Sequence, residues 1–300
     1  MLFLLKKILK TERIAIDVMF IYLYKKINHS YLFNPFKKKE SKILFIIGCQ
    51  RSGTSLMNRI FTRERHTSVY RESSQLSSKD SSKSRKLRLN SFQEIKSTLA
   101  KNYAPLIVIK PVVESQNALQ LLENFHESKI LWMYRNYKDA IRSYSKRFSG
   151  NRAIIDLKPI VEKDRKNWRA EKASDYVRSI IVKYFSEDMS QYDAIALFWF
   201  ARNQLFYELN LDLNSKVFIC KYEDLVAHPK EMMNNIYQFL DISFQEIRGI
   251  DEVHSQSVGK GDAIELSPSI DKLCYDLQEK LDYTYSLCGH TIKKIESQKN

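Results

Sequence analysis

The sequence has few cysteines, and they lie far apart. The 300 residues contain Cys49, Cys220, Cys274 and Cys288, with no Cys-x-x-Cys pair and no spacing with the six histidines that suits a metal ion. A disulfide-stabilised scaffold and a zinc site are therefore disfavoured, and we expect four reduced thiols in a cell interior.

Long apolar runs are also missing. A membrane span needs ~20 consecutive apolar residues. Here the apolar stretch at residues 1–9 is broken by Lys6 and Lys7, and the stretch at 14–24 contains Asp17. Neither stretch is followed by a small-residue cleavage site, which also disfavours a secretory signal. We therefore expect a cytoplasmic protein.

The sequence predicts a basic amphipathic segment at residues 1–40, followed by one domain over residues 41–300. Its polar side chains recur at steps of four, three and four, which places them on one helical stripe: Lys6, Lys10, Arg13 and Asp17. Two interpretations remain open for residues 1–30. The helix lies on a membrane surface, or it packs on the domain with its polar stripe in water.

The overall charge is strongly positive. Lys and Arg number 49 against 35 Asp and Glu, for a formal net charge of +14, while the hydrophobic share of 44% is ordinary for a soluble globular chain. Such an excess attracts nucleic acid, an anionic membrane surface, phosphorylated cofactors or acidic glycans. Charge alone does not choose among these partners.

Four short apolar runs are typical of buried parallel strands, at residues 42–47, 106–109, 129–134 and 216–220. Helical patterns lie between and after them, beginning at 56 and covering 116–125, 138–148, 156–206 and the stretch up to 239. Strands that alternate with helices predict an α/β fold with a doubly wound, mostly parallel sheet flanked by helices. The serine-rich stretch 73–84 predicts a mobile loop.

The strongest local signal follows the first strand and reads Gly-Cys-Gln-Arg-Ser-Gly-Thr-Ser-Leu-Met over residues 48–57. Gly48 and Gly53 are two of only seven glycines in the chain. Their position between a strand and a helix is typical of a phosphate-binding loop, in which backbone N–H groups face an anion. Thr54 and Ser55 add hydroxyl donors, and Arg51 adds a forked cation.

Two departures from an ATPase loop are informative. A Walker A loop has Lys where this sequence has Thr54, and the strand at 129–134 ends in Arg135 where a Walker-type enzyme has an Asp for magnesium. A cation at that place suits a second phosphate, and Ser143 follows on the next predicted helix. We therefore expect Arg135 and Ser143 to clamp a second phosphate, and we expect no metal.

Three segments carry a family resemblance: GCQRSGTSLM, MYRNYKDAIRSY and KYEDLVAHPKEMMNNIYQFL. From about Lys42 to the C-terminus the chain resembles sulfotransferases that use 3′-phosphoadenosine 5′-phosphosulfate (PAPS). It is closer to their carbohydrate and protein-tyrosine branches than to the cytosolic small-molecule branch. The resemblance implies PAPS as the sulfuryl donor. It also makes Glu223 and Asp224 look like helix N-terminal residues.

The resemblance also assigns the cofactor residues. In that family the first loop binds the 5′-phosphosulfate, and the matching positions here are Arg51, Ser52, Gly53, Thr54 and Ser55. The second motif binds the 3′-phosphate, which implies this role for Arg135 and Ser143. Some members close a basic loop over the same phosphate, and the segment HSQSVGKGD offers Lys260 for it, on a loop that its two glycines should make flexible.

Sulfuryl transfer needs cations for the charge on the departing phosphate and a base for the acceptor hydroxyl. Arg51 and Lys110 are candidates for the cationic role. The small-molecule branch has a histidine two positions after the matching lysine, where this chain has Val112. The other branches place a glutamate after the first helix, which implies Glu72 as the base. Glu114 is the competitor, and a salt bridge to Arg71 or Lys110 is the structural alternative for either carboxylate.

The sequence thus predicts transfer of a sulfuryl group from PAPS to a hydroxyl of an acceptor, and we expect a saccharide or glycoconjugate. One alternative is a kinase-like phosphotransferase, which would need a magnesium carboxylate and the missing loop lysine. Another is a non-catalytic basic protein on the same fold that binds polyanions through runs such as 83–88 and 142–152. The paired phosphate motifs favour the enzyme, and nucleic acid is not an expected partner.

Overall fold

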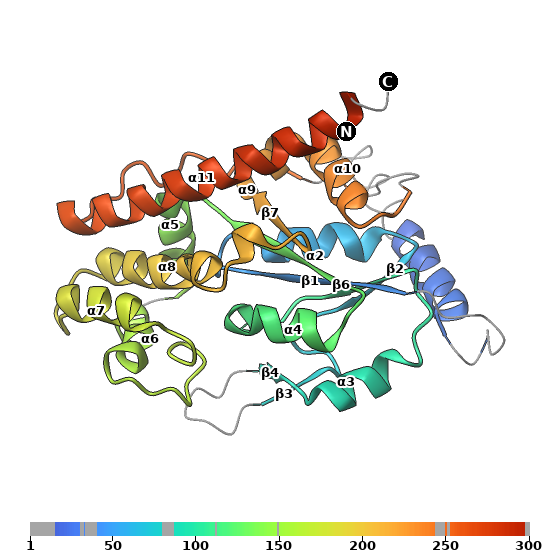
Figure 1. Cartoon of the computed structure of the whole chain (residues 1–300), viewed down its shortest axis with the longest axis horizontal. Helices are drawn as coiled ribbons and strands as arrows, with labels where there is room; N and C mark the ends of the chain where they lie inside the picture. Colours follow the sequence, from blue (N-terminus) through green and yellow to red (C-terminus); the bar gives the residue numbers. More distant parts are fainter. Residues whose placement is uncertain are drawn as a thin grey trace, which may run out of the picture.

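Short aliphatic runs form a central parallel sheet. The computed structural model describes residues 16–30, 33, 41–79, 87–111, 113–148, 150–243, 250 and 253–297. Within these ranges five strands pair in the order β2-β5-β1-β6-β7, all parallel (Figure 1). Their bounds are β1 Lys42–Gly48, β2 Thr67–Tyr70, β5 Leu106–Ile109, β6 Ser128–Tyr134 and β7 Val217–Lys221. A separate antiparallel pair joins β3, Ser77–Lys79, to β4, Leu87–Leu89.

Helices cover both faces of the sheet, as a doubly wound fold requires. On one face lie α2 Thr54–Arg63, α9 Tyr222–Ala227 and α10 Pro229–Phe239. On the other lie α3 Phe92–Leu99, α4 Ala118–Asn124, α5 Tyr137–Arg147, α6 Arg152–Val161, α7 Asp175–Tyr184, α8 Gln191–Glu208 and α11 Pro268–Ser297. Short 3₁₀ turns occupy Ser115–Asn117 and Leu211–Leu213.

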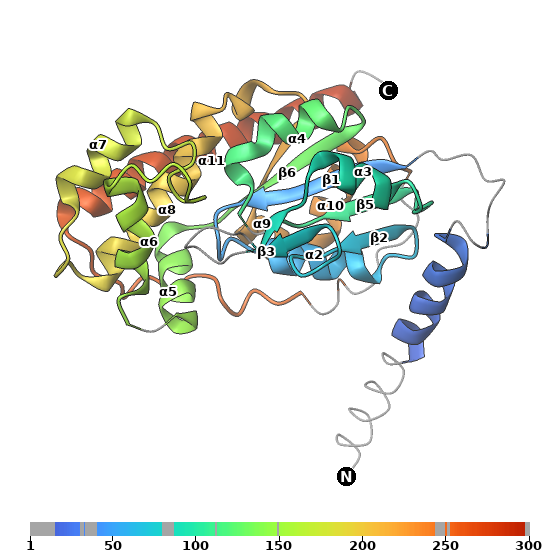
Figure 2. The ribbon, with the colours of Figure 1, turned by 90° about the horizontal axis from the view of Figure 1, so that it is seen from below.

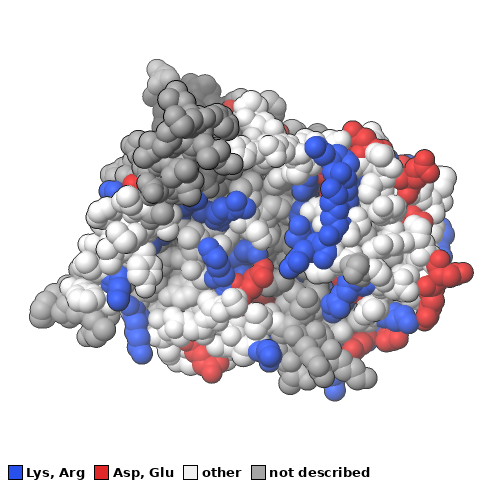
Figure 3. Space-filling view, turned by 180° about the vertical axis from the view of Figure 1, so that it is seen from behind, with Lys and Arg blue, Asp and Glu red and all other residues white. Residues whose placement is uncertain are grey.

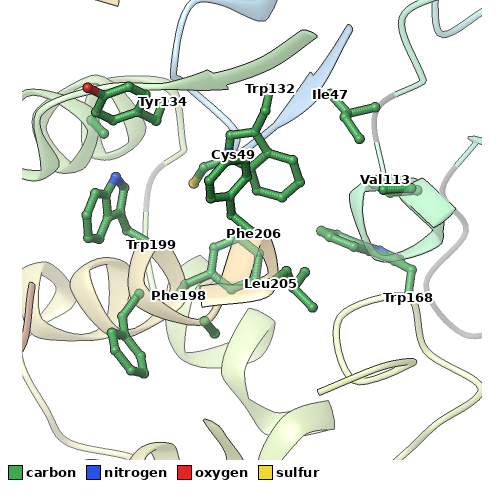
Figure 4. Close-up of a cluster of buried hydrophobic side chains, with 14 of the residues drawn as sticks. Ile47, Cys49, Val113, Trp132, Tyr134, Trp168, Phe198, Trp199, Leu205 and Phe206 are labelled. Atoms are coloured by element: carbon green, nitrogen blue, oxygen red, sulfur yellow. The ribbon is translucent and has the colours of Figure 1, made fainter. Parts of the chain in front are cut away.

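The strand side chains alternate between two hydrophobic cores. In β1, Leu44 and Ile46 pack with α2 and α10, whereas Phe45 and Ile47 face the other core. That second core is rich in aromatic side chains, and its Trp132 ring lies 5.4 Å from the ring of Phe206 in α8 (Figure 4). Because every central strand is buried on both faces, the strands read as continuous apolar runs in the sequence.

The order of the strands brings three loops to one edge. β1 lies between β5 and β6, so the chain leaves it to one side through α2 and later crosses to its other side through α4. The carboxyl ends of β1, β5 and β6 therefore lie together, followed by the glycine loop, Lys110 and Arg135 respectively. In open α/β sheets, ligands bind at such a reversal of strand order.

An N-terminal helix over residues 16–28 extends away from the sheet (Figure 2). Only its last turns attach to the domain, through buried Ile21 and through Lys25, whose Nζ donates to the Thr62 carbonyl at 2.7 Å. Most of its apolar side chains are exposed: Ile16, Val18, Met19, Phe20, Tyr22, Leu23 and Ile27. A search of the described helices finds none with the length and apolar character of a membrane span.

The interpretation that this helix packs on the domain therefore holds only for its C-terminal end. The exposed side chains of Ile16, Phe20, Leu23 and Ile27 recur at steps of four, three and four and form one apolar stripe. Of the predicted polar stripe, only Asp17 is described, because Lys6, Lys10 and Arg13 lie outside the described residues.

All four predicted strands and the helices that follow the first three are confirmed, with bounds within two residues, whereas the helix predicted after the fourth strand is two helices, α9 and α10. Two other predictions were wrong. The stretch predicted as a mobile loop contains β3 at Ser77–Lys79, because pairing with β4 satisfies its backbone groups; residues 80–84 lie outside the described ranges. The stretch 156–206 is three helices, α6 to α8, joined by turns.

Gly48 is required by the packing of β1 against β6. Its φ is +131°, and a Cβ atom there would lie 2.2 Å from the Met133 carbonyl oxygen. We expect Gly48→Ala to lower the free energy of unfolding by about 3 kcal/mol, at the upper end of ordinary single substitutions. Gly150→Ala is the control, because Gly150 also has a positive φ but nothing within 4 Å. Urea unfolding measures both variants; equal losses would show that the close approach is not what matters.

Candidate active site

The glycine loop presents an open helix N-terminus. Gly53 precedes α2 with a φ of +92°, and a Cβ atom there would lie 2.4 Å from the Tyr222 ring. No side chain caps α2, and its first turn has no acidic residue. The helix therefore begins with backbone N–H groups of Thr54 and Ser55 at the positive end of its dipole, which favours an anion.

The loop side chains divide between the surface and the interior. Arg51 is exposed, with a φ of +69°, and Thr54 and Ser55 line a cavity of about 400 Å³ beside the loop. Ser52 is completely buried and does not line the cavity. The turn of the loop points the Ser52 side chain inward, so the loop offers a ligand the backbone of this residue, and the assignment of Ser52 to the cofactor stays a prediction.

The cavity extends from the glycine loop to the helices beyond the sheet. It is lined by residues 47–51 and the start of α2, by Glu72 and Lys110, and by a group of basic and aromatic side chains. This last group, which we term the distal arm, consists of Tyr144, Arg147, Phe148, Arg152, Asp156, Trp168, Arg169 and Phe198. A volume of this size is typical of small-molecule sites.

Glu72 and Lys110 form an ion pair on the cavity wall. Lys110 follows β5, its backbone N–H donates to the Tyr70 carbonyl at 2.9 Å, and its Nζ donates to Glu72 Oε1. The ammonium is buried, whereas the Glu72 side chain keeps 38% of its surface exposed. The pairing of β2 with β5 thus places a carboxylate and an ammonium side by side, with the carboxylate open to the cavity.

Glu114, the competing carboxylate, is occupied elsewhere. Its oxygens accept from Arg88 Nε at 2.6 Å, from the Leu89 backbone N–H at 3.2 Å and from Asn117 Nδ2 at 2.8 Å. It is buried and does not line the cavity. Glu114 therefore joins β4 to the turn after β5, and of these two candidates only Glu72 lines the cavity.

The second motif lies against the glycine loop. Asn136 caps α5 by accepting from the Asp139 N–H at 3.1 Å, and Ser143 lies two turns further along the helix. Ser143 Oγ accepts from Arg51 Nε at 3.1 Å. Two predicted phosphate-binding residues, 92 positions apart in the chain, are thus in direct contact.

Arg135 is buried at the end of β6. Its Nη2 donates to the Ser257 carbonyl at 2.6 Å, and its guanidinium stacks 4.2 Å from the centre of the Tyr222 ring. Two carboxylates lie somewhat further away, Asp139 at 3.7 Å and Glu223 at 3.9 Å. Arg135 thus lies between the YEDL segment and the loop before residue 260. Glu223 and Asp224 do occupy the first turn of α9.

Lys260 lies on a loop that is pinned to α5. The Asp139 carboxylate accepts from the N–H groups of Gly259 and Gly261 at 2.9 and 2.7 Å. A Cβ atom on Gly261 would lie 2.3 Å from the Lys138 backbone. Gly261 therefore allows close approach to the helix and Gly259 adopts a positive φ of +69°, in place of the flexibility that we expected, and the exposed Lys260 is held near Arg135.

Arginine side chains are concentrated around the loop. The pKa of Arg51 is lowered, first by burial and then by the charges of Arg147 and Arg135. Arg147 was missed in the sequence, although it lies four residues after Ser143 and so on the same face of α5. Among the described residues, no carboxylate lies within 4 Å of Arg51 or Arg147. A bound anion would relieve this repulsion, and at Arg51 the sulfate and phosphate groups of PAPS fit such a site.

The surface charge is unevenly distributed. On the face shown in Figure 3, Lys and Arg side chains gather in the middle, around a depression, whereas Asp and Glu lie mostly toward one margin. Such a concentration of one sign raises the local concentration of anionic ligands. From the run at 83–88, only residues 87 and 88 are described, and Arg88 is paired with Glu114 and Glu171 rather than open to a polyanion.

No group of three or more His, Cys, Asp or Glu side chains that could hold a metal ion occurs in the described part of the chain. The described cysteines are unpaired thiols, and burial raises the pKa of Cys49 to about 12. Neither observation assigns them a role in the site, and the expectation of a metal-independent reaction stays a prediction.

The comparisons with known proteins agree with this geometry. The family model described as "Sulfotransferase domain" matches residues 41–272. Among solved structures, the sulfotransferase domain of the curacin biosynthetic pathway is 15% identical, with a TM-score of 0.51 over 82% of this chain and 99% of that one. This likeness shows a shared fold. No match was found among curated proteins.

Two other solved structures are more distant. The sulfotransferase domain of the Synechococcus PCC 7002 olefin synthase is 13% identical, with a TM-score of 0.47 over 83% of this chain and 98% of that one. Mouse sulfotransferase SULT7A1, solved in complex with PAP, is 12% identical, with a TM-score of 0.43 over 90% of this chain and 95% of that one.

The family match spans most of the chain, includes both phosphate motifs and the Glu72–Lys110 pair, and decides against the kinase-like alternative. Members of this family use PAPS as the sulfuryl donor. The chain belongs to the sulfotransferase domain family and is a PAPS-dependent sulfotransferase.

Proposed function

We propose that the acceptor is a hydroxyl of a saccharide or glycoconjugate and that Glu72 is the base. The observation that carries this proposal is the cavity shared by the glycine loop, the Glu72–Lys110 pair and the distal arm. Trp168 and Phe198 offer apolar ring surfaces in that arm, and arginines and Asp156 surround them with polar groups. Apolar walls with a few fixed polar groups suit a sugar ring, which has both kinds of surface.

The cofactor residues follow from the two motifs. We assign the 5′-phosphosulfate end to Arg51, Thr54, Ser55 and the backbone of residues 52 and 53, at the start of α2. The 3′-phosphate is assigned to Arg135, Ser143 and Lys260, which the strand edge, α5 and the pinned loop bring to one place. When bound, PAPS supplies an activated sulfuryl group with a phosphate as its leaving group.

The protein's contribution to the reaction is a base beside cations. The Glu72 carboxylate accepts the proton of the acceptor hydroxyl, whose oxygen becomes the nucleophile. Lys110 holds Glu72 in place through their ion pair, and Lys110 and Arg51 provide positive charge where negative charge develops. The buried position of Lys110 strengthens its effect, because less water screens it.

We expect Arg51→Ala and Arg135→Lys each to weaken binding of the desulfated product, 3′-phosphoadenosine 5′-phosphate (PAP), about tenfold or more, since each loses charge-assisted hydrogen bonds. Calorimetric titration of the purified chain with PAP, beside ATP–magnesium, measures this effect. Arg59→Ala, an exposed arginine of α2 outside the cavity, is the control. A thermal unfolding curve of each variant confirms that it is folded. Unchanged PAP affinity in Arg135→Lys would overturn the 3′-phosphate assignment.

Glu72→Gln separates catalysis from binding. The amide keeps the size of the side chain but cannot accept the proton, so we expect kcat to fall about 100-fold or more. PAP affinity should change little. Transfer of labelled sulfate from PAPS to a panel of neutral and acidic oligosaccharides measures the rate. Glu123→Gln, an exposed residue of α4, is the control. A variant that retains the wild-type rate would exclude Glu72 as the base.

We also propose a cytoplasmic protein whose residues 1–30 contact a membrane surface. The support is the exposed apolar stripe of the helix over residues 16–28. Lys26 lies on the same helix and Lys101 beside its end, where anionic headgroups would meet them. In the described residues the apolar side of this helix faces solvent rather than the sheet.

Vesicle binding tests this contact. The wild-type chain is expected to sediment with vesicles that contain 20% phosphatidylserine. The double substitution Phe20→Ser and Leu23→Ser should reduce the bound fraction severalfold, because it removes apolar area that the membrane would bury. Leu213→Ser is the matched control, because Leu213 is 81% exposed elsewhere on the domain. Equal sedimentation of the double variant and the control would refute the contact.

A further inference from the structure

The distal arm has more positive than negative charge. Three guanidinium groups, those of Arg147, Arg152 and Arg169, line it with one carboxylate, Asp156. None of these residues belongs to the two phosphate motifs that are assigned to the cofactor. The arm therefore adds positive charge to the cavity beyond those motifs, and we take it as the acceptor site; the charge of Arg147 also acts on Arg51 of the glycine loop.

Asp156 is already fully engaged by its neighbours. Oδ2 accepts from the Tyr144 hydroxyl, and Oδ1 accepts from Arg169 Nη2 and lies 3.3 Å from Arg152 Nε. The carboxylate is buried, so water does not compete for these interactions. Asp156 thus forms ion pairs with Arg169 and Arg152, and it forms none with Arg147.

Arg147 is the cation without a counterion. It lies on the last turn of α5, is exposed to the cavity, and has no carboxylate within 4 Å among the residues that the structure describes. Arg152, at the start of α6, keeps 36% of its side chain exposed. Two guanidinium groups at the ends of consecutive helices therefore line the cavity with donors available to a ligand.

The wall behind them adds further positive charge. Arg202 of α8 is completely buried, with its guanidinium 5.2 Å from the centre of the Trp168 ring. Burial lowers the pKa of Arg202 to about 10 and also lowers the pKa of Arg169. The cost of burying these cations is reduced when an anion binds nearby, because the interior screens their field only weakly.

The ring surfaces in the arm limit the shape of the ligand. Trp168 meets Phe198 edge to face, with ring centres 6.1 Å apart, and Arg169 stacks 4.5 Å from the Trp168 ring (Figure 4 shows Trp168 and Phe198). These rings give the arm an apolar surface, and the guanidinium groups of Arg147 and Arg152 line the same cavity. A ring that carries an anionic substituent matches both surfaces.

We infer that the acceptor is acidic, a saccharide ring that carries a carboxylate or a sulfate, and that this anion binds Arg147 and Arg152 while the reacting hydroxyl faces Glu72. The inference rests on the proposed function, since it takes the distal arm as the acceptor site. Arginine, rather than lysine, suits this role because its planar fork binds a carboxylate or sulfate through two parallel hydrogen bonds.

The decisive experiment compares matched acceptors. Sulfuryl transfer from PAPS is measured on a uronic-acid-containing oligosaccharide and on the same oligosaccharide with its carboxyl groups reduced to alcohols. The wild-type chain is expected to show a kcat/KM at least tenfold higher on the acidic form. Arg147→Gln and Arg152→Gln should each remove most of this preference, mainly through KM. Arg152→Gln should also leave the rate on the reduced form and the affinity for PAP unchanged. Lys146→Ala, an exposed neighbour on α5 that does not line the cavity, is the control.

Two outcomes would overturn the inference. One is an equal kcat/KM on the acidic and reduced forms in the wild-type chain. The other is a parallel loss on both acceptors in Arg147→Gln with weaker PAP binding, which would place Arg147 in the cofactor site.

A second acceptor pair separates this inference from the proposed function. If PAP binds and neither saccharide is sulfated, the saccharide proposal fails, and 4-hydroxyphenylacetate is compared with 4-hydroxyphenylacetamide. A preference for the carboxylate that Arg147→Gln abolishes would retain the anion site of the distal arm with a phenolic acceptor. No preference would overturn it.

Discussion

The site depends on the close approach of β1 to β6. Gly48 lies so near the Met133 backbone that a single additional carbon atom would collide with it, and Ser115 Oγ exchanges hydrogen bonds with both backbone groups of Gly48. This contact fixes where β1 ends and therefore where the glycine loop begins. The positions of Arg51, of the start of α2 and of Arg135 at the end of β6 all follow from it, because each comes directly after one of these two strands.

Around this edge the protein gathers positive charge that its own carboxylates only partly neutralise. Arg135 and Arg169 are buried with aromatic rings and nearby acidic groups, whereas Arg51 and Arg147 lie at the cavity without carboxylates within 4 Å in the described ranges. Mutual repulsion and desolvation disfavour such an arrangement in the free protein. The same repulsion makes anionic ligands bind more favourably in this cavity.

The elements that the sequence predicted are those with a strong local pattern. Strands buried on both faces have continuous apolar runs, so β1, β5, β6 and β7 could be recognised. β2, whose residues are mostly half-buried, and the short pair β3 and β4 could not, because their pairing depends on partners distant in the chain. The turns that separate α6, α7 and α8 were missed because neither connection, 162–174 or 185–190, contains a glycine or proline that would mark a break.

The glycine loop and the Arg135–Ser143 motif were determined by the sequence alone, because their chemistry lies in residues close together along the chain. Only the tertiary structure separated Glu72 from Glu114. Both follow strands of the same sheet edge, yet Glu114 is sequestered by Arg88 and Asn117, whereas Glu72 meets Lys110 at the cavity. Likewise, the role of the glycines around Lys260 became visible only with Asp139 beside them. Contacts between side chains far apart in sequence follow from packing, which a local pattern does not contain.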